Sequence, residues 1–319
     1  IRGTGAYLPE KVLSNHDLEK IVDTSDEWIV QRSGIKQRHI AADDQSTGDM
    51  AIEAAKMALA NSGVSPEDID GIIVATTTPD RTFPAVAVKV QDAIGAPHGI
   101  AFDVQAVCTG FVYALSVANN FITARQAKRI LVIGAEKMSS ILDWTDRTTC
   151  VLFGDGAGAV IIEADESGQG TLDDRGVLSS HLYANGGGRD LLYTDGGPST
   201  TGESGKIVMH GREVFKHAVK CMADVVQEAL DQNDLTAADI DWLVPHQANA
   251  RIIEATAKKL SLPMEQVVLT VERHGNTSAA SIPLALHEAV SDGRIQKDQL
   301  LLLEAMGGGL TWGAVLVRF

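Results

Sequence analysis

The sequence contains few cysteines and none of the spacings that bind zinc. Cys108, Cys150 and Cys221 are the three cysteines of the 319-residue chain, and no CxxC pair occurs among them. An odd and widely spaced set predicts neither a disulfide framework nor a zinc knuckle, so a reducing compartment, the cytoplasm, is expected. No other metal-ligand spacing is present, and GDGAGA at Gly154 lacks the Lys-Ser/Thr pair of a phosphate-binding loop. We therefore expect no metal ion.

Long apolar runs and excess positive charge are also absent. No run of about eighteen apolar residues occurs, and the chain opens on the strand-like IRGTGAYLP rather than on a charged segment followed by an apolar one. We expect neither a membrane span nor an export signal. Lysine and arginine number 27 against 42 acidic residues, a net charge of −15. This balance argues against a nucleic-acid surface, and it would repel an acidic protein partner unless basic residues cluster locally.

Apolar runs alternate with amphipathic segments through the first half of the chain. The expected elements are a helix over Ser46–Ser62, a strand over Ile72–Thr76, a helix over Ala85–Ile94, a strand over Ile100–Val104, a helix over Thr109–Ala124, and strands over Arg129–Ile133 and Gly154–Ala164. This alternation predicts an α/β fold with a largely parallel sheet covered by helices on both faces.

The second half repeats the order of the first at an offset of roughly 170 residues. MAIEAAKMAL recurs as MADVVQEAL, and KRILVIGAE recurs as DQLLLLEAM. Two related halves, 1–165 and 166–319, are therefore expected. The Gly-, Asp- and Ser-rich stretch 166–206 is expected to be an excursion with little regular structure. Because functional groups lie at the carboxyl ends of parallel strands, the two halves would direct two sets of loops at one shared site.

Cys108 lies in the segment AVCTGF, at the junction between the predicted strand Ile100–Val104 and the predicted helix Thr109–Ala124. N–H groups at a helix start and the positive end of the helix dipole lower the pKa of a thiol, and the thiolate is the species that attacks acyl groups. We therefore predict a nucleophilic cysteine with a lowered pKa. The alternative is that Cys108 is a small, buried residue of the hydrophobic core with no chemical role.

Two polar residues of the second half occupy the same kind of junction. His246 in WLVPHQAN follows an apolar strand, and Asn276 in ERHGNTSAAS follows a strand predicted over Val267–Val271. The offset aligns Cys108 with Ser278, beside Asn276. Taken singly, each is open to a structural explanation, since a strand-end histidine often serves only as a hydrogen-bond partner and GN is a turn dipeptide. Together they supply a nucleophile, an imidazole and an amide donor, a set suited to acyl transfer.

Consecutive glycines occur in EAMGGGLTWGAVLV near the end of the chain. Glycines let backbone N–H groups approach a substrate oxygen closely, as an oxyanion hole requires, although a loose turn between two strands would use them equally well. In this order and spacing, AVCTGF, FGDGAGA, PHQAN, HGNTSAAS and GGGLTWG resemble the β-ketoacyl-acyl carrier protein synthase III family along essentially the whole chain. The resemblance implies a homodimer and a thiolase-like fold, in which two duplicated βαβαβαββ halves form five αβαβα layers.

The resemblance also implies a reaction. An acyl-CoA, by expectation acetyl-CoA, would acylate Cys108 with CoA as the leaving group, so acyl-CoA is a substrate and no cofactor is expected. His246 and Asn276 would bind the thioester carbonyl of malonyl-acyl carrier protein and stabilise the enolate formed as CO2 leaves. The enolate would then attack acyl-Cys108 and give a β-ketoacyl-carrier protein, which initiates fatty acid synthesis. The backbone N–H groups of Cys108 and Gly308 would form the oxyanion hole.

Further positions match the binding residues of that family. The residues matched to a CoA site are Trp28 and Arg147 on either side of the adenine, Arg32 at a phosphate and Asn249 at the pantetheine. The residues matched to the acyl pocket are Phe153, Met306, and Phe83 reaching across the dimer interface. Met306 stands where many relatives have an aromatic residue; it is apolar and adaptable, so we expect the site to stay dry.

Basic residues recur at helical spacing on two predicted helices of the second half, and we expect them to bind the acidic carrier protein. They are Arg212, Lys216 and Lys220 on one helix and Arg251, Lys258 and Lys259 on the other, of which Lys216, Arg251 and Lys258 are the docking candidates. The alternative is that these basic residues lie on solvent-exposed helix faces and bind no partner.

Three other functions stay open for the chain: a synthase III paralogue of secondary metabolism, a Cys/His/Asn hydrolase and a non-catalytic partner subunit.

Overall fold

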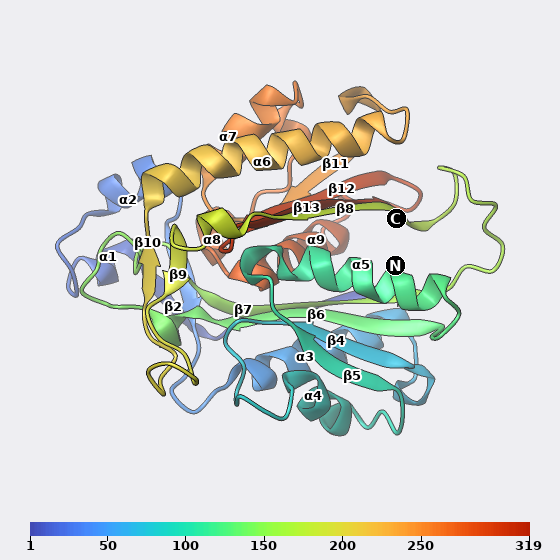
Figure 1. The fold of residues 1–319 in the computed structure, drawn as a ribbon, viewed down its shortest axis with the longest axis horizontal. Helices are drawn as coiled ribbons and strands as arrows, with labels where there is room; N and C mark the ends of the chain where they lie inside the picture. Colours follow the sequence, from blue (N-terminus) through green and yellow to red (C-terminus); the bar gives the residue numbers. More distant parts are fainter.

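Two β-sheets alternate with three layers of helices (Figure 1). The computed structural model describes residues 1–319. The first sheet contains, in order, β1 (Gly3–Tyr7), β7 (Asp155–Glu163), β6 (Arg129–Lys137), β4 (Gly71–Ala75) and β5 (Ile100–Val104). The second contains β11 (Trp242–Pro245), β12 (Leu300–Gly307), β13 (Thr311–Arg318) and β8 (Gly176–Ala184).

The helices form the outer and central layers of this stack. In Figure 1 the outer face of the first sheet is covered by α3 (Thr47–Ser62) and α4 (Val86–Ile94). The outer face of the second sheet is covered by α6 (Gly211–Asp231) and α7 (Ala250–Lys259). The central layer, between the two sheets, consists of α5 (Gly110–Thr123) and α9 (Ser281–Ser291). The predicted αβαβα arrangement is therefore confirmed.

Shorter elements lie at the end of the stack where α5 begins. They are the paired strands β2 (Lys11–Ser14) and β3 (Gln37–Ile40), the paired strands β9 (Leu192–Thr194) and β10 (Ile207–Met209), and the helices α1 (Asn15–Leu18), α2 (Asp26–Ser33) and α8 (Val271–His274). None of the helices combines the length and the apolar character needed to cross a membrane.

The predicted elements of the first half form for simple local reasons. Every residue of β4 is buried, as expected for a strand with parallel neighbours on both sides and helices on both faces. α3 begins after Ser46, because Ser46 and Asp49 exchange hydrogen bonds with each other's backbone N–H groups. The helix ends at Gly63, whose φ of 67° is a conformation that glycine adopts at little cost.

The prediction of a largely parallel sheet is wrong in part. β4, β5 and β6 are parallel, but β7 pairs antiparallel with both β6 and β1. In the second sheet only β11 and β12 are parallel. The stretch 166–206 also contains more structure than expected, since β8 pairs with β13 along its length. β8 is only half buried and reads GVLSSHLYA, so it lacks the continuous apolar run by which the other strands are recognised.

The strand predicted over Val267–Val271 is also wrong. Only Val267 pairs with a strand, through a single bridge to Leu243, and α8 begins at Val271. The side chain of Gln247 explains the early end, because its Oε1 accepts the backbone N–H groups of Thr270 (2.8 Å) and Val271 (3.0 Å). These donors are therefore not available to a strand ladder.

The two halves show the predicted duplication and meet in a shared central core. Gly71 and Trp242, Gly110 and Ser281, and Arg129 and Leu300 begin equivalent elements 171 residues apart. At this offset Val107 aligns with Ser278, and both residues have a φ of 49° at the start of a short turn; the predicted alignment of Cys108 with Ser278 is therefore off by one residue. One apolar cluster contains residues of α5, α9 and both sheets, so the two halves share a central core.

Candidate active site

Cys108 lies at the turn between β5 and α5. Residues Val107–Thr109 form a short 3₁₀ turn, and α5 continues from Gly110. The position at a helix start is as predicted, but Cys108 is only 4% exposed. Burial raises the pKa of the Cys108 thiol to about 12. The predicted lowering of the pKa is therefore wrong, and the resting side chain is a protonated thiol.

Two cavities meet at Cys108. The smaller, of about 100 Å³, is lined by residues that include Cys108, Phe153, His246, Asn249, Asn276 and Met306. The larger, of about 410 Å³, is lined by residues that include Cys108, Phe153, Ile207, Gly308 and Gly309. The structure thus brings the predicted nucleophile, imidazole and amide to one cavity, and the glycine run to the adjoining one.

His246 follows β11 and is buried. Its backbone N–H donates to the carbonyl of Glu304 (2.8 Å), which extends the pairing of β11 with β12 by one bond. Nδ1 has no hydrogen-bond partner in the protein. Burial lowers the pKa of the His246 imidazole to about 3, so the ring is neutral at physiological pH. It can therefore offer a single N–H to a substrate without bringing a charge.

Asn276 has a fixed side-chain orientation. Its Oδ1 accepts the backbone N–H of Ser278 (2.9 Å), which leaves the Nδ2 amide group as the available donor. The backbone of Asn276 also bonds to the loop before β7, because its N–H donates to the Leu152 carbonyl (2.9 Å) and its carbonyl accepts the Gly154 N–H (3.0 Å). Residues from the two halves thus hold a donor amide beside Cys108.

The glycine run packs against the backbone of the nucleophile turn. A Cβ at Gly307 would lie 2.8 Å from the backbone nitrogen of Cys108 and 3.2 Å from the carbonyl oxygen of Ala106. A Cβ at Gly308 would lie 2.7 Å from the carbonyl oxygen of Leu192. Only glycine permits so close an approach of two backbones, which is the arrangement that an oxyanion hole of main-chain N–H groups requires.

The predicted CoA residues lie together at the surface near α2. The guanidinium carbon of Arg32 lies 4.7 Å and that of Arg147 5.2 Å from the centroid of the Trp28 ring. An adenine placed between Trp28 and Arg147 needs roughly 7 Å, twice a van der Waals contact, so Arg147 would have to move outward. Asn249 lines the small cavity, and its side chain caps α7 and donates to the Arg32 carbonyl (2.9 Å).

The three predicted acyl-pocket residues are divided between two places. Phe153 and Met306 are buried and line the small cavity, and Phe153 lines the large cavity as well. Phe83 lies on the loop before α4, lines neither cavity of its own chain and is 82% exposed. Phe83 therefore does not contribute to the acyl pocket of its own chain.

The predicted docking residues lie on α6 and α7, which pack side by side (Figure 1). Lys216 forms an ion pair with Glu213 (3.1 Å), while Arg251 lies 5.7 Å from the Phe215 ring centroid. Asp224 of α6 pairs with Lys220 of the same helix (3.5 Å) and with Lys259 of α7 (2.8 Å). Of the six basic residues, the three without a carboxylate partner are Arg212, Arg251 and Lys258.

Sequence reasoning missed several buried polar residues around the site. Glu136 ends an apolar run on β6 and accepts hydrogen bonds from Thr76, Thr77, Thr78 and Ser278. Glu304 lies within β12, and neither of its carboxylate oxygens has a partner. These residues could have been recognised in the sequence as charged residues inside otherwise apolar strands. Burying a charge is costly, so charged residues at such positions are rare.

Glu304→Gln should stabilise the protein at pH 8 and have little effect at pH 5. Burial raises the pKa of Glu304 from 4.5 to about 8. The folded protein therefore keeps a proton that the unfolded chain releases, and the free energy of unfolding falls by about 1.4 kcal/mol per pH unit between these values. Urea denaturation should show the variant about 4 kcal/mol more stable than wild type at pH 8. Glu254→Gln on the exposed face of α7 is the control, and an equal effect at both pH values would contradict the prediction.

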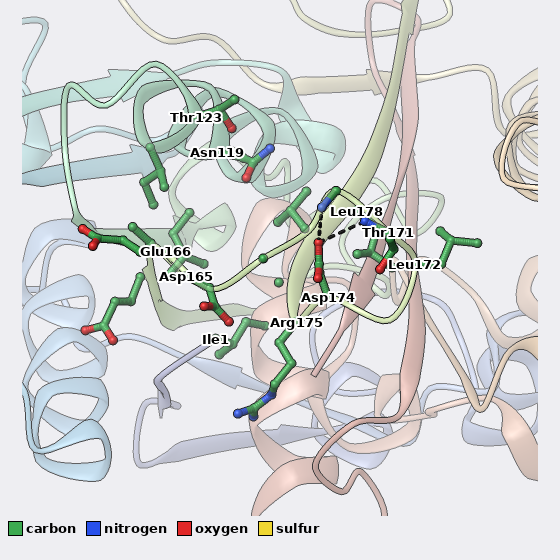
Figure 2. A pocket seen from close by; sticks show the side chains of 18 of the residues that line it. Ile1, Asn119, Thr123, Asp165, Glu166, Thr171, Leu172, Asp174, Arg175 and Leu178 are labelled. Atoms are coloured by element: carbon green, nitrogen blue, oxygen red, sulfur yellow. Dashed lines mark hydrogen bonds between the residues drawn. The ribbon is translucent and has the colours of Figure 1, made fainter.

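A further cavity, of about 1090 Å³, lies away from Cys108, at the C-terminal end of α5 (Figure 2). Figure 2 shows polar side chains of α5 and of the loop after β7 around it, including Asn119 and Asp165. The Asp174 carboxylate accepts the N–H groups of Gly170 (2.6 Å) and Thr171 (3.0 Å) in its own loop. This cavity shares no residue with the two at Cys108, so it does not belong to the candidate active site.

The fold and the site together define the class of thiolase-type condensing enzymes, in which a cysteine, a neutral histidine and an asparagine line one cavity. The family model "3-Oxoacyl-[acyl-carrier-protein (ACP)] synthase III" matches residues 102–186, and the model of its C-terminal region matches 230–319. A β-ketoacyl-[acyl-carrier-protein] synthase III of Rhodospirillum centenum is 66% identical over 319 residues, which covers 100% of this chain and 98% of that protein.

Solved structures agree with this comparison. The 3-oxoacyl-[acyl-carrier-protein] synthase III of Aquifex aeolicus VF5 is 50% identical, with a TM-score of 0.94 and coverage of 100% of this chain and 99% of that chain. The priming β-ketosynthase of the R1128 polyketide pathway is 33% identical, with a TM-score of 0.93 and coverage of 100% and 95%. The chain belongs to the β-ketoacyl-acyl carrier protein synthase III family of condensing acyltransferases. The thiolase-like fold is confirmed, and a papain-like hydrolase is excluded.

Proposed function

We propose that this chain catalyses the decarboxylative condensation of an acyl-CoA with malonyl-acyl carrier protein, which gives a β-ketoacyl-carrier protein, CoA and CO2 and initiates fatty acid synthesis. The observation that carries the proposal is the shared cavity lined by Cys108, His246 and Asn276. Identity of 66% to a synthase III, against 33% to a polyketide priming enzyme, favours this reaction over one in secondary metabolism. All three cysteines are free thiols, which supports a reducing cytoplasm as the place of the reaction.

The first half-reaction transfers the acyl group to Cys108. Sγ attacks the carbonyl carbon of the acyl-CoA, and the negative charge that develops on the carbonyl oxygen is stabilised by the backbone N–H groups of Cys108 and Gly308. The bond to the CoA sulfur then breaks and CoA leaves as a thiolate. One acyl group remains on the enzyme, so the kinetics are ping-pong.

The second half-reaction uses His246 and Asn276. The imidazole N–H and the Asn276 amide donate hydrogen bonds to the thioester carbonyl of malonyl-carrier protein, and these bonds strengthen as CO2 leaves and the oxygen becomes an enolate. A neutral histidine suits this task, because it does not hold the malonyl carboxylate by charge. Met306 and Phe153 are apolar and exclude water from the cavity. The enolate carbon attacks acyl-Cys108, and the cysteine leaves as the product forms.

The acyl chain is proposed to occupy the larger cavity, beside Phe153 and Ile207. The exposed Phe83 supports a homodimer, in which each Phe83 reaches into the acyl pocket of its partner. Acetyl-CoA is the proposed starter. Because Phe83 of the partner would determine the free depth of this cavity, Phe83 is also a proposed determinant of chain length.

Trp28→Ala should raise the KM for acyl-CoA roughly tenfold and change kcat less than twofold. The proposed role of Trp28 is to stack on the adenine opposite Arg147, with Arg32 at a phosphate and Asn249 at the pantetheine. Steady-state kinetics with varied acyl-CoA test this. The control substrate is an acyl-pantetheine without the nucleotide, whose KM should be the same in both proteins. An equal rise in KM for both substrates would show that Trp28 does not bind the adenine.

Arg251→Glu should lower kcat/KM for malonyl-carrier protein roughly tenfold at low salt and leave the KM for acyl-CoA unchanged. Arg251, Lys258 and Lys216 are the proposed contacts for the acidic carrier, and Arg251 has no carboxylate partner of its own. Because the contact is electrostatic, the difference from wild type should shrink as salt is added. Lys56→Glu on α3 is the matched control, since that helix covers the opposite side of the molecule. An equal loss in both variants would contradict a docking role.

The proposed function is tested by incubating the protein with each member of an acyl-CoA series and malonyl-carrier protein, and identifying the carrier-bound product by mass spectrometry. We expect a β-ketoacyl-carrier protein two carbons longer than the starter, with one CO2 released per product. Hydrolysis of the acyl-CoA without product would instead support a hydrolase.

A further inference from the structure

Glu136 is a buried carboxylate that none of the roles described above requires. It lies near the end of β6, is fully buried and forms no ion pair with a lysine, arginine or histidine. Hydroxyls and one backbone N–H donate to it instead: Thr76 Oγ1 (3.2 Å), Thr77 N and Oγ1 (3.0 Å each), Thr78 Oγ1 (2.7 Å) and Ser278 Oγ (3.1 Å). Burying a carboxylate without a cation is costly, so its position requires an explanation.

The three threonines hold the carboxylate in one place. They directly follow β4 and belong to the same half of the chain as Glu136. Oε2 accepts hydrogen bonds from all three of them, while Oε1 accepts the bond from Ser278 of the other half. Glu136 is therefore a fixed acceptor for the Ser278 hydroxyl.

Ser278 begins a turn with an unusual backbone conformation. Its φ is 49°, in the left-handed region that residues other than glycine rarely adopt. β6 packs directly against this turn, since a Cβ at Gly134 would overlap the carbonyl oxygen of Ala279. This close approach brings the Glu136 carboxylate, two residues further along β6, to the Ser278 hydroxyl.

Ser278 also contacts the side chain of Asn276. The backbone N–H of Ser278 donates to Asn276 Oδ1 (2.9 Å). A half-turn of a side-chain amide exchanges its donor and its acceptor, so the amide presents a defined end only where a partner fixes it. With Oδ1 engaged by Ser278, Nδ2 is the end that remains available to a substrate. Asn276 lines the small cavity, whereas neither Glu136 nor Ser278 lines either cavity at Cys108.

We propose that Glu136 is a positioning residue for Asn276, which it orients through the hydroxyl and the backbone N–H of Ser278. The bond to Glu136 anchors the Ser278 side chain in the left-handed turn, and the anchored turn directs its N–H at Asn276 Oδ1. Nδ2 is then in place before the malonyl thioester arrives, and no rotation is needed as the enolate forms. This inference rests on the proposed function.

The rates of the two half-reactions, measured separately by rapid quench and intact-protein mass spectrometry, test the proposal. Ser278→Ala removes the hydroxyl that binds Glu136. We expect it to slow condensation of the preformed acyl-enzyme about tenfold, with acylation of Cys108 within about twofold of wild type. Normal acylation also shows that the variant is folded. Ser281→Ala is the matched control, because Ser281 is a buried serine that bonds to Thr277, and it should condense like wild type.

A double variant shows whether the effect passes through Asn276. Asn276→Ala removes the group that is positioned, so adding Ser278→Ala in that background should cause no further loss of condensation. A role of Ser278 in the fold alone would slow condensation by the same factor in both backgrounds.

Glu136→Gln tests the carboxylate itself. The amide has one acceptor oxygen, and the Thr77 N–H can only donate, so the oxygen turns to Thr77 and the NH2 group to Ser278. The Ser278 hydroxyl then loses its acceptor and must accept instead. We expect a smaller loss of condensation than in Ser278→Ala, about threefold, and no further loss when Glu136→Gln is added to Ser278→Ala.

Three results would overturn the positioning role: condensation by Ser278→Ala within twofold of wild type, acylation lost as severely as condensation, or an additive loss in either double variant. The wild type reports separately on the proposed function. If it forms acyl-Cys108 and malonyl-carrier protein yields no β-ketoacyl product, the function is wrong and the positioning role fails with it.

Discussion

His246→Ala and Asn276→Ala should each lower the rate of condensation by about 10²–10³-fold while leaving acylation of Cys108 within about threefold of wild type. Each removes one of the two hydrogen-bond donors proposed for the enolate oxygen. The donors proposed for acyl transfer are different, namely the backbone N–H groups of Cys108 and Gly308, so acyl transfer should continue. The two half-reactions are separated by forming the acyl-enzyme first and then adding malonyl-carrier protein.

The pH dependence of these variants adds a second test. Because burial lowers the pKa of His246 to about 3, the wild-type imidazole is neutral at every pH between 5 and 9, and its protonation should not limit condensation in that range. His98→Ala, at an exposed site, is the control and should have no effect. If His246→Ala lost acylation as severely as condensation, the histidine would act on Cys108 and the division of roles would be wrong.

Gly307→Ala should reduce both half-reactions by more than about 10²-fold, although it adds a single methyl group. The new Cβ would lie 2.8 Å from the backbone nitrogen of Cys108 and 3.2 Å from the Ala106 carbonyl oxygen. Both are backbone atoms, so the nucleophile turn or the glycine run must shift by several tenths of an ångström. Such a shift misaligns the main-chain N–H groups with the substrate oxygen. Stopped-flow measurement of each half-reaction tests this.

Gly186→Ala is the matched control, because a Cβ at that position would meet nothing within 4 Å. It should retain full activity. Circular dichroism should show that Gly307→Ala is folded, since the substitution is confined to the end of one strand. Activity within threefold of wild type in Gly307→Ala would contradict the close approach of the two backbones and the oxyanion hole built on it.

Elements with a strong local pattern could be predicted from the sequence. α3 has a capping box at one end and glycine at the other, and β4 is a continuous apolar run, so both were located within one or two residues. β8 was missed, because its residues are only half buried and its position depends on pairing with β13, which lies far along the chain. The strand expected at Val267–Val271 failed because a single side chain, Gln247, takes up its backbone donors.

For the site, too, local motifs could be predicted from the sequence, whereas properties that depend on residues distant in the chain could not. Cys108, His246 and Asn276 stand in recognisable motifs at element junctions, and the structure brings them to one cavity. The pKa of Cys108 could not be predicted from its position at a helix start, because it is raised by burial among residues from both halves. Glu136 and Ser278 were not recognised as a pair for a similar reason, since they are 142 residues apart and meet only when the two halves pack together.

The central claim is that Cys108 carries the acyl group between two substrates. The most direct measurement is the intact mass of wild type and Cys108→Ala after incubation with acetyl-CoA, followed by addition of malonyl-carrier protein. We expect wild type to gain one acetyl group that is discharged only by malonyl-carrier protein, and Cys108→Ala to gain none. Acetylation that persists in Cys108→Ala, or that is lost to water without malonyl-carrier protein, would contradict the account.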